Sequence, residues 1–273
     1  MHLHIETSGS VATLLIDRPD RHNAFSDEMW SALPGLLTRV EQDRSIRVLV
    51  VASSTARVFS AGADVAELRL ALEDPDGAER GLRHIRTAFQ ALIDLPIPTV
   101  AAIRGACHGG GVGLAVCCDI RIADTSATFS IPPARLGLLY PFPALNRLVW
   151  MLGPGQAKRL LFSARPFDAD QAAQFGFVDE LHQPDHFETA LERLVSEVAA
   201  NSPLSVRSMK RAVSLIEQAA PDGESLVRAL ELEALASADH AEGVAAFLGK
   251  RLPVFGQTVV DTTELSPPTS VGQ

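Results

Sequence analysis

Two short segments of small residues are the places where this sequence can do chemistry. The first is VFSAGAD, residues 58–64, and the second is RGACHGGGVGLA, residues 104–115. Each follows an apolar stretch of strand length and precedes a helical pattern, so each is expected at the C-terminal end of a parallel strand, where open α/β sheets bind ligands. Small residues let a ligand approach the backbone, and the first amides of a helix have no partner within it. We therefore expect both turns to present backbone N–H groups to a ligand.

A phosphate-binding loop is the main alternative for the glycine-rich segment. HGGGVGLA fits the dinucleotide fingerprint only loosely, and no acidic partner is suitably placed after the next strand. The Gly-Lys-Ser/Thr ending of a P-loop is missing as well. Tight packing or a flexible loop is a further alternative, since glycine-rich turns have many uses. Two separate turns that each donate one amide fit an oxyanion hole better than they fit a phosphate site.

The segments around these turns alternate between strand and helix patterns. Because the central strands are apolar on both faces, they are expected in a parallel sheet covered by helices, which indicates an α/β fold. A helix is predicted to begin at Ser26 as N-cap, and Pro34 is expected to kink or break it. Strands are predicted at residues 3–7, 11–17, 47–52, 99–103 and 120–123, and further helices at 78–95, 203–218, 224–237 and 240–250. We expect an α/β core over residues 1–200, a helical region over 201–256 and a flexible tail over 257–273.

Composition excludes several kinds of partner. The net charge of −9 makes the surface repel phosphate polymers, so no nucleic-acid partner is expected. Apolar runs are far shorter than the roughly 18 residues that cross a bilayer, and MHLHIETSGS lacks the pattern of a secretory signal. Cys107, Cys117 and Cys118 form no CxxC pair and are interpreted as buried thiols, so no metal site is expected. We expect a cytoplasmic protein that does not enter membranes.

The chain resembles the crotonase, or enoyl-CoA hydratase/isomerase, superfamily over nearly its whole length. Six stretches carry the resemblance in this order: IDRPDRHNAFSDEM, VFSAGADVAEL, PTVAAIRGACHGGGVGLAVCCDIRIAD, FSIPPARLGLLYP, FDADQAAQFGFVDEL and EGVAAFLGKRLPVF. The resemblance implies a spiral of ββα units with a C-terminal helical region that makes homotrimers, often paired into hexamers. It also implies an acyl-CoA substrate in fatty acid metabolism, with coenzyme A as part of the substrate and no prosthetic group.

The same resemblance implies where the substrate binds. The backbone N–H groups of Ala63 and Gly110 are expected to form an oxyanion hole that holds the thioester oxygen as it gains enolate charge. The residues expected at the coenzyme A portion are Arg21, Ala61, Asp64, Phe247 and Lys250. A solvated helix end is the alternative for Lys250, because basic residues favour the last turn of a helix.

The chain departs from the hydratase pattern at its acid–base positions. Hydratases of this family use two glutamates, and the matching positions here are Gly113 and Pro133. A third acidic position, used by some isomerases and a dehalogenase, is Pro141. None of these residues transfers a proton, and each such group typically supplies roughly 10²–10⁴-fold in rate. Decarboxylation or isomerisation is therefore favoured over hydration.

Tyr140 is the candidate for a remaining catalytic side chain. Its segment is similar to that of the methylmalonyl-CoA decarboxylases, in which a tyrosine at this position faces the departing carboxylate; those enzymes carry histidine where this chain has Ala63. A half-buried aromatic side chain with a satisfied hydroxyl is the alternative. His84 and Arg86 lie on a helix that borders the acyl pocket in this family, or on a solvated face.

Two further functional interpretations stay open at this point. The protein is an enoyl-CoA hydratase whose acid and base come from other positions, or it is a catalytically silent acyl-CoA-binding protein. The second alternative follows if Gly113 and Pro133 record lost catalysis. Turnover of crotonyl-CoA would separate these two alternatives.

Overall fold

A computed structural model describes residues 2–70 and 73–256 of the chain. It contains two compact units, Met1–Ala199 and Ala200–Gln273, called the N-terminal and C-terminal units below. The tail predicted for residues 257–273 lies outside the described residues. Both turns singled out from the sequence belong to the N-terminal unit.

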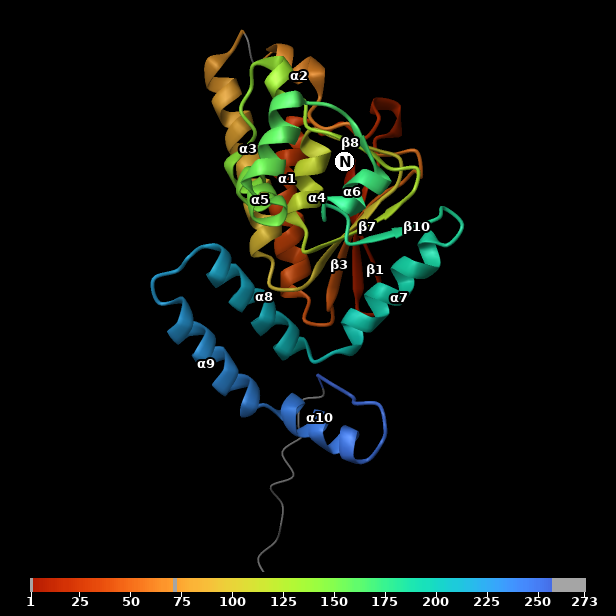
Figure 1. Ribbon diagram of the computed structural model, residues 1–273, viewed down its shortest axis with the longest axis vertical. Helices are drawn as coiled ribbons and strands as arrows, with labels where there is room; N and C mark the ends of the chain where they lie inside the picture. The colour runs from red at the N-terminus through yellow and green to blue at the C-terminus, as the bar shows by residue number, and fades with distance from the viewer. Residues whose placement is uncertain (1, 71–72, 257–273) are drawn as a thin grey trace, which may run out of the picture. The chain divides into compact units, whose positions relative to one another are not determined.

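The N-terminal unit is built around a six-stranded sheet (Figure 1). Its strand order is β1-β2-β3-β5-β7-β10, with an antiparallel β1–β2 hairpin and parallel pairing from β2 onward. The strands span Leu3–Ser8 (β1), Val11–Ile16 (β2), Val48–Ser53 (β3), Thr99–Ile103 (β5), Ile120–Asp124 (β7) and Glu180–His182 (β10). The predictions for the first five of these strands are confirmed to within about a residue or two at each end.

A second, four-stranded sheet carries the two turns. Its order is β4-β6-β8-β9, with parallel β4–β6 and β6–β8 pairs and an antiparallel β8–β9 pair. The strands span Val58–Ser60 (β4), Ala106–His108 (β6), Thr128–Ser130 (β8) and Phe167–Asp168 (β9). The sequence does not reveal this sheet, because strands of two or three residues are too short to show a periodic pattern.

Helices complete a repeated ββα arrangement. Each of three successive units contributes one strand to the large sheet, the next strand to the small sheet, and then one or two helices. The helices of the N-terminal unit are α1 (Asp27–Gln42), α2 (Val65–Leu70), α3 (Pro75–Asp94), α4 (Gly110–Cys117), α5 (Phe142–Ser163), α6 (Ala169–Gln174) and α7 (Phe187–Ala200), with 3-10 turns at Pro19–Arg21 and Pro133–Leu136. The expectation of an α/β spiral is confirmed.

Helix α1 begins where the sequence predicted. Ser26 is its N-cap, and the hydroxyl of Ser26 accepts a hydrogen bond of 3.3 Å from the Met29 amide. Pro34 does not break the helix, which continues to Gln42. Of the two outcomes expected at Pro34, a kink or a break, the continuous helix excludes the break. The buried side chains on both sides of Pro34, such as Leu33 and Leu37, hold this helix against the core.

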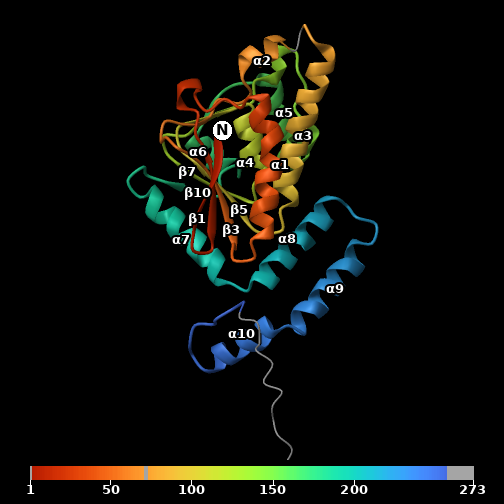
Figure 2. The same ribbon diagram turned by 180° about the vertical axis from the view of Figure 1, so that it is seen from behind.

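Helices cover both faces of the large sheet, as predicted. Helices α1, α3 and α5 pack side by side on one face, and α7 lies on the other (Figures 1 and 2). Alternate residues of the parallel strands point to opposite faces. The residues packed with the first group of helices include Leu49, Val51, Ala101, Ile103 and Ala123. The residues packed with α7 are Val48, Val50, Val100, Ala102 and Ile122.

The three cysteines are buried free thiols. Burial raises the pKa of Cys107 and of Cys117 well above the usual value for a thiol. Across the described part of the chain, no cluster of three His, Cys, Asp or Glu side chains is arranged to hold a metal ion. Within the same residues, no helix combines the length and the apolar character that crossing a bilayer needs.

The C-terminal unit is helical, as expected. Its helices are α8 (Pro203–Glu217), α9 (Gly223–Leu235) and α10 (Ala238–Leu248). Its last described turn is tied back by Arg251, which makes hydrogen bonds of 2.6 and 2.7 Å to the two carboxylate oxygens of Glu242. The bonds from Arg251 and from the Val254 amide lower the pKa of Glu242 to about 2.

Gly105, at the entry to β6, provides a test of how tightly the turns are packed. Its φ is +64°, and an added β-carbon would overlap the carbonyl group of Arg57. Gly137 has a similar φ of +69° but open space around it. We expect Gly105→Ala to cost at least about 3 kcal/mol of unfolding free energy and Gly137→Ala about 1–2 kcal/mol, measured by urea denaturation. Equal losses would show that the backbone contact at Gly105 has no consequence.

Candidate active site

The two turns predicted to carry chemistry meet in space. β4 and β6 are neighbours, so the residues that follow them lie side by side. A β-carbon added to Gly62 would lie 2.8 Å from the Gly110 amide nitrogen and 2.8 Å from the His108 carbonyl oxygen. A β-carbon added to Gly110 would lie 3.4 Å from the Ala63 amide nitrogen. Only glycine permits this approach, which brings the amides of Ala63 and Gly110 together.

These two amides have no acceptor among residues 2–70 and 73–256. The neighbouring amides are occupied, since Asp64 N donates to Phe25 O and Gly109 N donates to Ser130 O, both at 2.9 Å. Backbone donors in folded proteins rarely stay unpaired. The pair is therefore available to an oxygen atom of a ligand.

Hydrogen bonds to the carbonyl oxygens orient both peptide units. Gly62 O accepts from the Phe25 amide at 2.7 Å, and Gly109 O accepts from the Tyr140 hydroxyl at 2.9 Å and from the Gly113 amide at 3.1 Å. In a trans peptide the C=O and the following N–H lie in one plane and point in opposite directions. Fixing each carbonyl therefore fixes the N–H of Ala63 and the N–H of Gly110 before a ligand arrives.

Tyr140 lies behind the glycine turn, and its side chain is buried. Its hydroxyl donates its one hydrogen to Gly109 O, and burial raises the pKa of Tyr140 well above its usual value. These contacts match the alternative given in the sequence analysis, a tyrosine whose hydroxyl hydrogen bond is satisfied within the protein. The role of Tyr140 towards a departing carboxylate, which the resemblance suggested, stays a prediction. Contact with a substrate would require the bond to Gly109 to break.

An aromatic ring occupies the position where a hydratase glutamate would extend. A β-carbon added to Gly113 would lie 2.9 and 3.1 Å from the Cε2 and Cε1 atoms of Phe89, which is fully buried. Phe89 meets Trp30 edge-on at 5.3 Å between ring centroids, and Trp30 packs against Phe25 at 4.3 Å. The other expected acid position, Pro133, begins a 3-10 turn. The wall beside Gly110 is therefore aromatic and carries no carboxylate.

Restoring the missing glutamate tests this packing. Gly113→Glu should lower the unfolding free energy by more than about 3 kcal/mol, because the side chain meets Phe89 and its charge is buried. Adding Phe89→Ala makes room, so the double variant should be more stable than the sum of the single losses by about 1–3 kcal/mol. A double-mutant cycle by urea denaturation measures this coupling. Additive losses would show that Phe89 does not exclude a side chain at position 113.

A cluster of ionisable groups lies at the first turns of α1 and α2 and on α3. The Asp27 amide donates to the Glu67 carboxylate at 2.6 Å, and Asp27 Oδ1 lies 2.7 Å from His84 Nδ1. Burial raises the pKa of Glu67, and the charges of Asp64 and Asp27 add to this rise, while the hydrogen bond from the Asp27 amide opposes it. Sequence analysis considered His84 but missed its partners, because no spacing rule links positions 57 residues apart.

The raised pKa of Glu67 predicts a pH-dependent stability. The folded state binds the proton of the Glu67 carboxyl group more tightly than the unfolded state does. This proton therefore stabilises the folded state at pH values below the usual glutamate pKa. It is lost as pH rises through the raised value. In the Glu67→Gln variant the side-chain oxygen at position 67 can still accept a hydrogen bond from the Asp27 amide, but the carboxylate charge is gone. The thermal midpoint of this variant relative to wild type should therefore rise between about pH 4 and pH 7. A constant or falling difference would contradict this account.

Three of the residues expected at coenzyme A lie together in the N-terminal unit. The Ala61 amide donates to His22 O at 3.0 Å, which joins the β4 turn to the 3-10 turn that contains Arg21. Arg21 is exposed. Asp64 forms an ion pair of 2.8 Å with Arg18, a residue that sequence analysis did not single out. This pairing makes Asp64 a structural anchor of the turn.

Electrostatics support that role for Asp64. Burial acts to raise the pKa of Asp64, but hydrogen bonds from the Ala66 amide and from Arg18 and the nearby positive charges outweigh it, and the pKa lies below its usual value. Asp64 therefore stays ionised. The exposed Arg21 beside it supplies positive charge at the surface of a chain whose net charge is −9.

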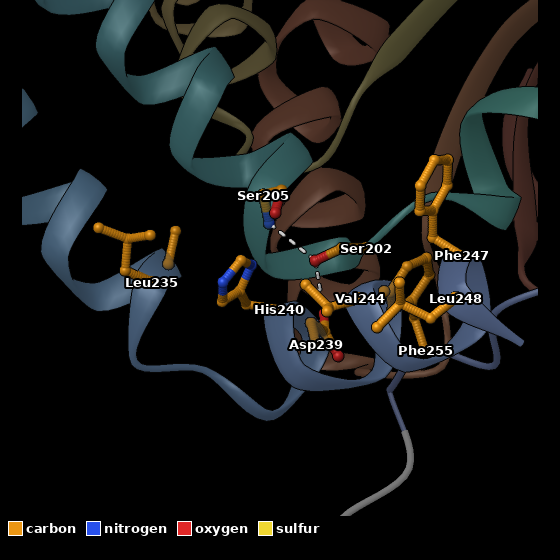
Figure 3. A pocket seen from close by; sticks show the side chains of 11 residues that line it. Ser202, Ser205, Leu235, Asp239, His240, Val244, Phe247, Leu248 and Phe255 are labelled. Atoms are coloured by element: carbon orange, nitrogen blue, oxygen red, sulfur yellow. Dashed lines mark hydrogen bonds between the residues drawn. The ribbon is translucent and has the colours of Figure 1, made fainter.

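The other two expected residues belong to the C-terminal unit. Phe247 is 84% exposed and lines a hollow of about 430 Å³ in that unit (Figure 3). Ser202 and Asp239 form the polar side of this hollow through a 2.6 Å hydrogen bond. Lys250 follows α10 with a φ of +50°, and its amide donates to Phe247 O at 3.2 Å. The contact of Phe247 and Lys250 with coenzyme A stays a prediction.

Comparisons with known proteins define the class of this site. The enoyl-CoA hydratase/isomerase family model matches residues 6–258. A crotonyl-CoA hydratase from Syntrophomonas wolfei is 32% identical over 92% of this chain and 96% of its own. The solved structure of an enoyl-CoA hydratase/isomerase family protein from Hyphomonas neptunium has a TM-score of 0.90 and 33% identity, covering 94% and 98% of the two chains. An enoyl-CoA hydratase from Bacillus anthracis has a TM-score of 0.88 and 27% identity, covering 93% and 99%.

The fold, the length and the sequence of this chain match one protein family. The chain belongs to the enoyl-CoA hydratase/isomerase family and has the crotonase fold. It is thus an acyl-CoA enzyme of this family. The resemblance recognised in the six sequence stretches is confirmed.

Proposed function

We propose that this protein forms an enolate from a coenzyme A thioester by decarboxylation or by a double-bond shift, with Ala63 N and Gly110 N as the oxyanion hole. The observation that carries the proposal is the pair of unused amides whose peptide planes are fixed from behind. Such donors stabilise charge that develops in the transition state without having to reorient during the reaction.

Decarboxylation suits a site with these parts. The bond between the α-carbon and the carboxylate breaks, CO₂ leaves, and the electron pair moves through the α-carbon onto the thioester oxygen. The amides of Ala63 and Gly110 stabilise that oxygen, and the enolate then takes a proton at the α-carbon. No strong base is needed for the first step. Loss of one such donor typically costs about 3 kcal/mol of transition-state stabilisation.

Hydration demands more than these parts offer. A water molecule has to be deprotonated and a proton delivered to carbon, and the expected glutamate positions hold Gly113 and Pro133. Phe89 occupies the space beside Gly113. These features support enolate chemistry without paired glutamates.

Hydration by other residues is the second candidate function. The relative from Syntrophomonas wolfei is named a crotonyl-CoA hydratase. One observation favours this candidate here: Asp27 and His84 form a paired acid–base group next to Glu67, whose pKa is raised by burial. In that case the histidine, with Nδ1 held by Asp27, is the general base. A silent acyl-CoA-binding protein is the third alternative.

Binding of coenzyme A is proposed at the exposed surface of the β4 turn. Arg21 offers a positive charge to a phosphate group. The backbone around Ala61 and Asp64 forms the β4 turn, which the bond from Ala61 N to His22 O joins to the 3-10 turn of Arg21. The contact of Phe247 and of Lys250 with coenzyme A remains a separate prediction. The assembly into trimers or hexamers and the cytoplasmic address also stay predictions.

Turnover of two substrates separates the three candidates. We expect methylmalonyl-CoA to lose CO₂, followed by mass spectrometry, and crotonyl-CoA to remain without hydration, followed by its absorbance. Gly62→Ala places a β-carbon 2.8 Å from Gly110 N and should lower kcat by about 100-fold or more. Gly137→Ala, with comparable φ and open space, is the matched control and should retain activity.

The contrary outcomes are distinct. Prompt hydration of crotonyl-CoA overturns the preference for decarboxylation and favours the hydratase. Binding of both thioesters without turnover favours the silent binder. Equal activity of Gly62→Ala and wild type, with both folded by circular dichroism, contradicts the oxyanion hole.

A further inference from the structure

Trp30 carries a buried hydrogen-bond donor without a partner. Its side chain is 2% exposed, and in the described part of the chain only its Nε1 and Gln156 Nε2 are buried side-chain polar atoms that bond nothing. An unpaired buried donor destabilises the folded state, and folded proteins keep few of them. Such a donor in a functional region indicates an acceptor that arrives with a ligand.

The indole ring lies against the proposed oxyanion hole. A β-carbon added to Gly110 would lie 3.0 Å from Trp30 Cζ2 and 3.4 Å from Cη2. Cζ2 is the nearer of these atoms, and in indole it is separated from Nε1 by a single ring atom. The Cζ2–Cη2 edge of the ring therefore meets Gly110, and Nε1 lies two bonds from Cζ2, close to that edge. A thioester held by the Gly110 amide places its acyl group beside this edge.

The surroundings of Trp30 strengthen its N–H as a donor. Phe25 packs on the ring with a 33° angle between planes, and Phe89 meets it at 83°. Both phenylalanines are fully buried, so no side chain in this stack competes for the donor. A hydrogen bond formed in apolar surroundings is stronger than one formed in water. Tyr140 cannot take this part while its hydroxyl is bonded to Gly109.

We propose that Trp30 donates its indole N–H to an oxygen atom on the acyl group, next to the thioester carbonyl held by Gly110. This rests on the proposed function and deepens it by naming the substrate class. The substrates are acyl-CoA thioesters with an acceptor oxygen close to the thioester, namely a carboxylate on the α-carbon or an oxo group on the β-carbon. A neutral donor orients a carboxylate without the strong ground-state stabilisation that a lysine or arginine gives, which leaves CO₂ loss favourable.

Binding of three stable thioesters tests this role. Butyryl-CoA has no acceptor, acetoacetyl-CoA has a β-oxo group, and 2-sulfopropionyl-CoA has a sulfonate that cannot leave as CO₂. For Trp30→Phe, calorimetric titration should show about 10-fold weaker binding of one or both oxygen-bearing thioesters, while butyryl-CoA changes by less than about 3-fold. The thioester that loses affinity identifies the acceptor as carboxylate-like or oxo. Equal weakening of all three, or of none, overturns the proposal.

Trp150 provides the matched control. It is the only other tryptophan of the chain, and it is 52% exposed on α5. Trp150→Phe should leave all three affinities unchanged. In that variant Trp30 is the sole tryptophan, so its fluorescence should change on saturation with an oxygen-bearing thioester that binds.

The fluorescence measurement on the Trp150→Phe variant does not depend on the stability of the Trp30→Phe variant. Unchanged emission of the Trp150→Phe variant with a saturating oxygen-bearing thioester overturns the role of Trp30. Failure of wild type to bind any of the three thioesters is a different result, since it overturns the proposed function itself.

Discussion

The orientation of two peptide planes is the constraint on which the site depends. The amides of Ala63 and Gly110 are fixed in orientation because the carbonyl oxygens of the same peptide units, Gly62 O and Gly109 O, accept hydrogen bonds from Phe25 and Tyr140. An amide that had to reorient during the reaction would lose part of its stabilising effect. The short parallel strands β4 and β6 supply the register, and the missing side chain of Gly62 allows contact.

The aromatic wall and the missing glutamates are two aspects of the same packing. Phe89 occupies the space beside Gly113 because that residue has no side chain, and Trp30 then fills the space between Phe89 and Phe25. A buried carboxylate and this stack exclude each other on steric grounds and because of the desolvation of the charge. An apolar wall therefore lies where the resemblance places a glutamate, and the N–H of Trp30 is a neutral donor in that wall.

Charged and ionisable groups join the segments next to this apolar wall. Arg18 binds Asp64 on one side of the turn, and Asp27 connects Glu67 with His84 on the other. The Arg18–Asp64 contact joins the turn after β4 to the residue before the first 3-10 turn. The contacts of Asp27 join the starts of α1 and α2 to α3. Because the Asp27–His84 pair is partly exposed, its contribution to stability is modest, and its main effect is to hold the neighbouring backbone in place.

The sequence by itself determined the family, the α/β class, most strands of the large sheet and the two turns. Those features are encoded locally, in apolar runs, an N-cap such as Ser26 and glycine at positions of close approach. Only the tertiary structure decided the partner of Tyr140, the place of Phe89 beside Gly113 and the pairing of Asp27 with His84. Their partners lie 24 to 57 residues apart in the sequence, and side-chain packing between separate helices and turns, which no local pattern records, brings them together.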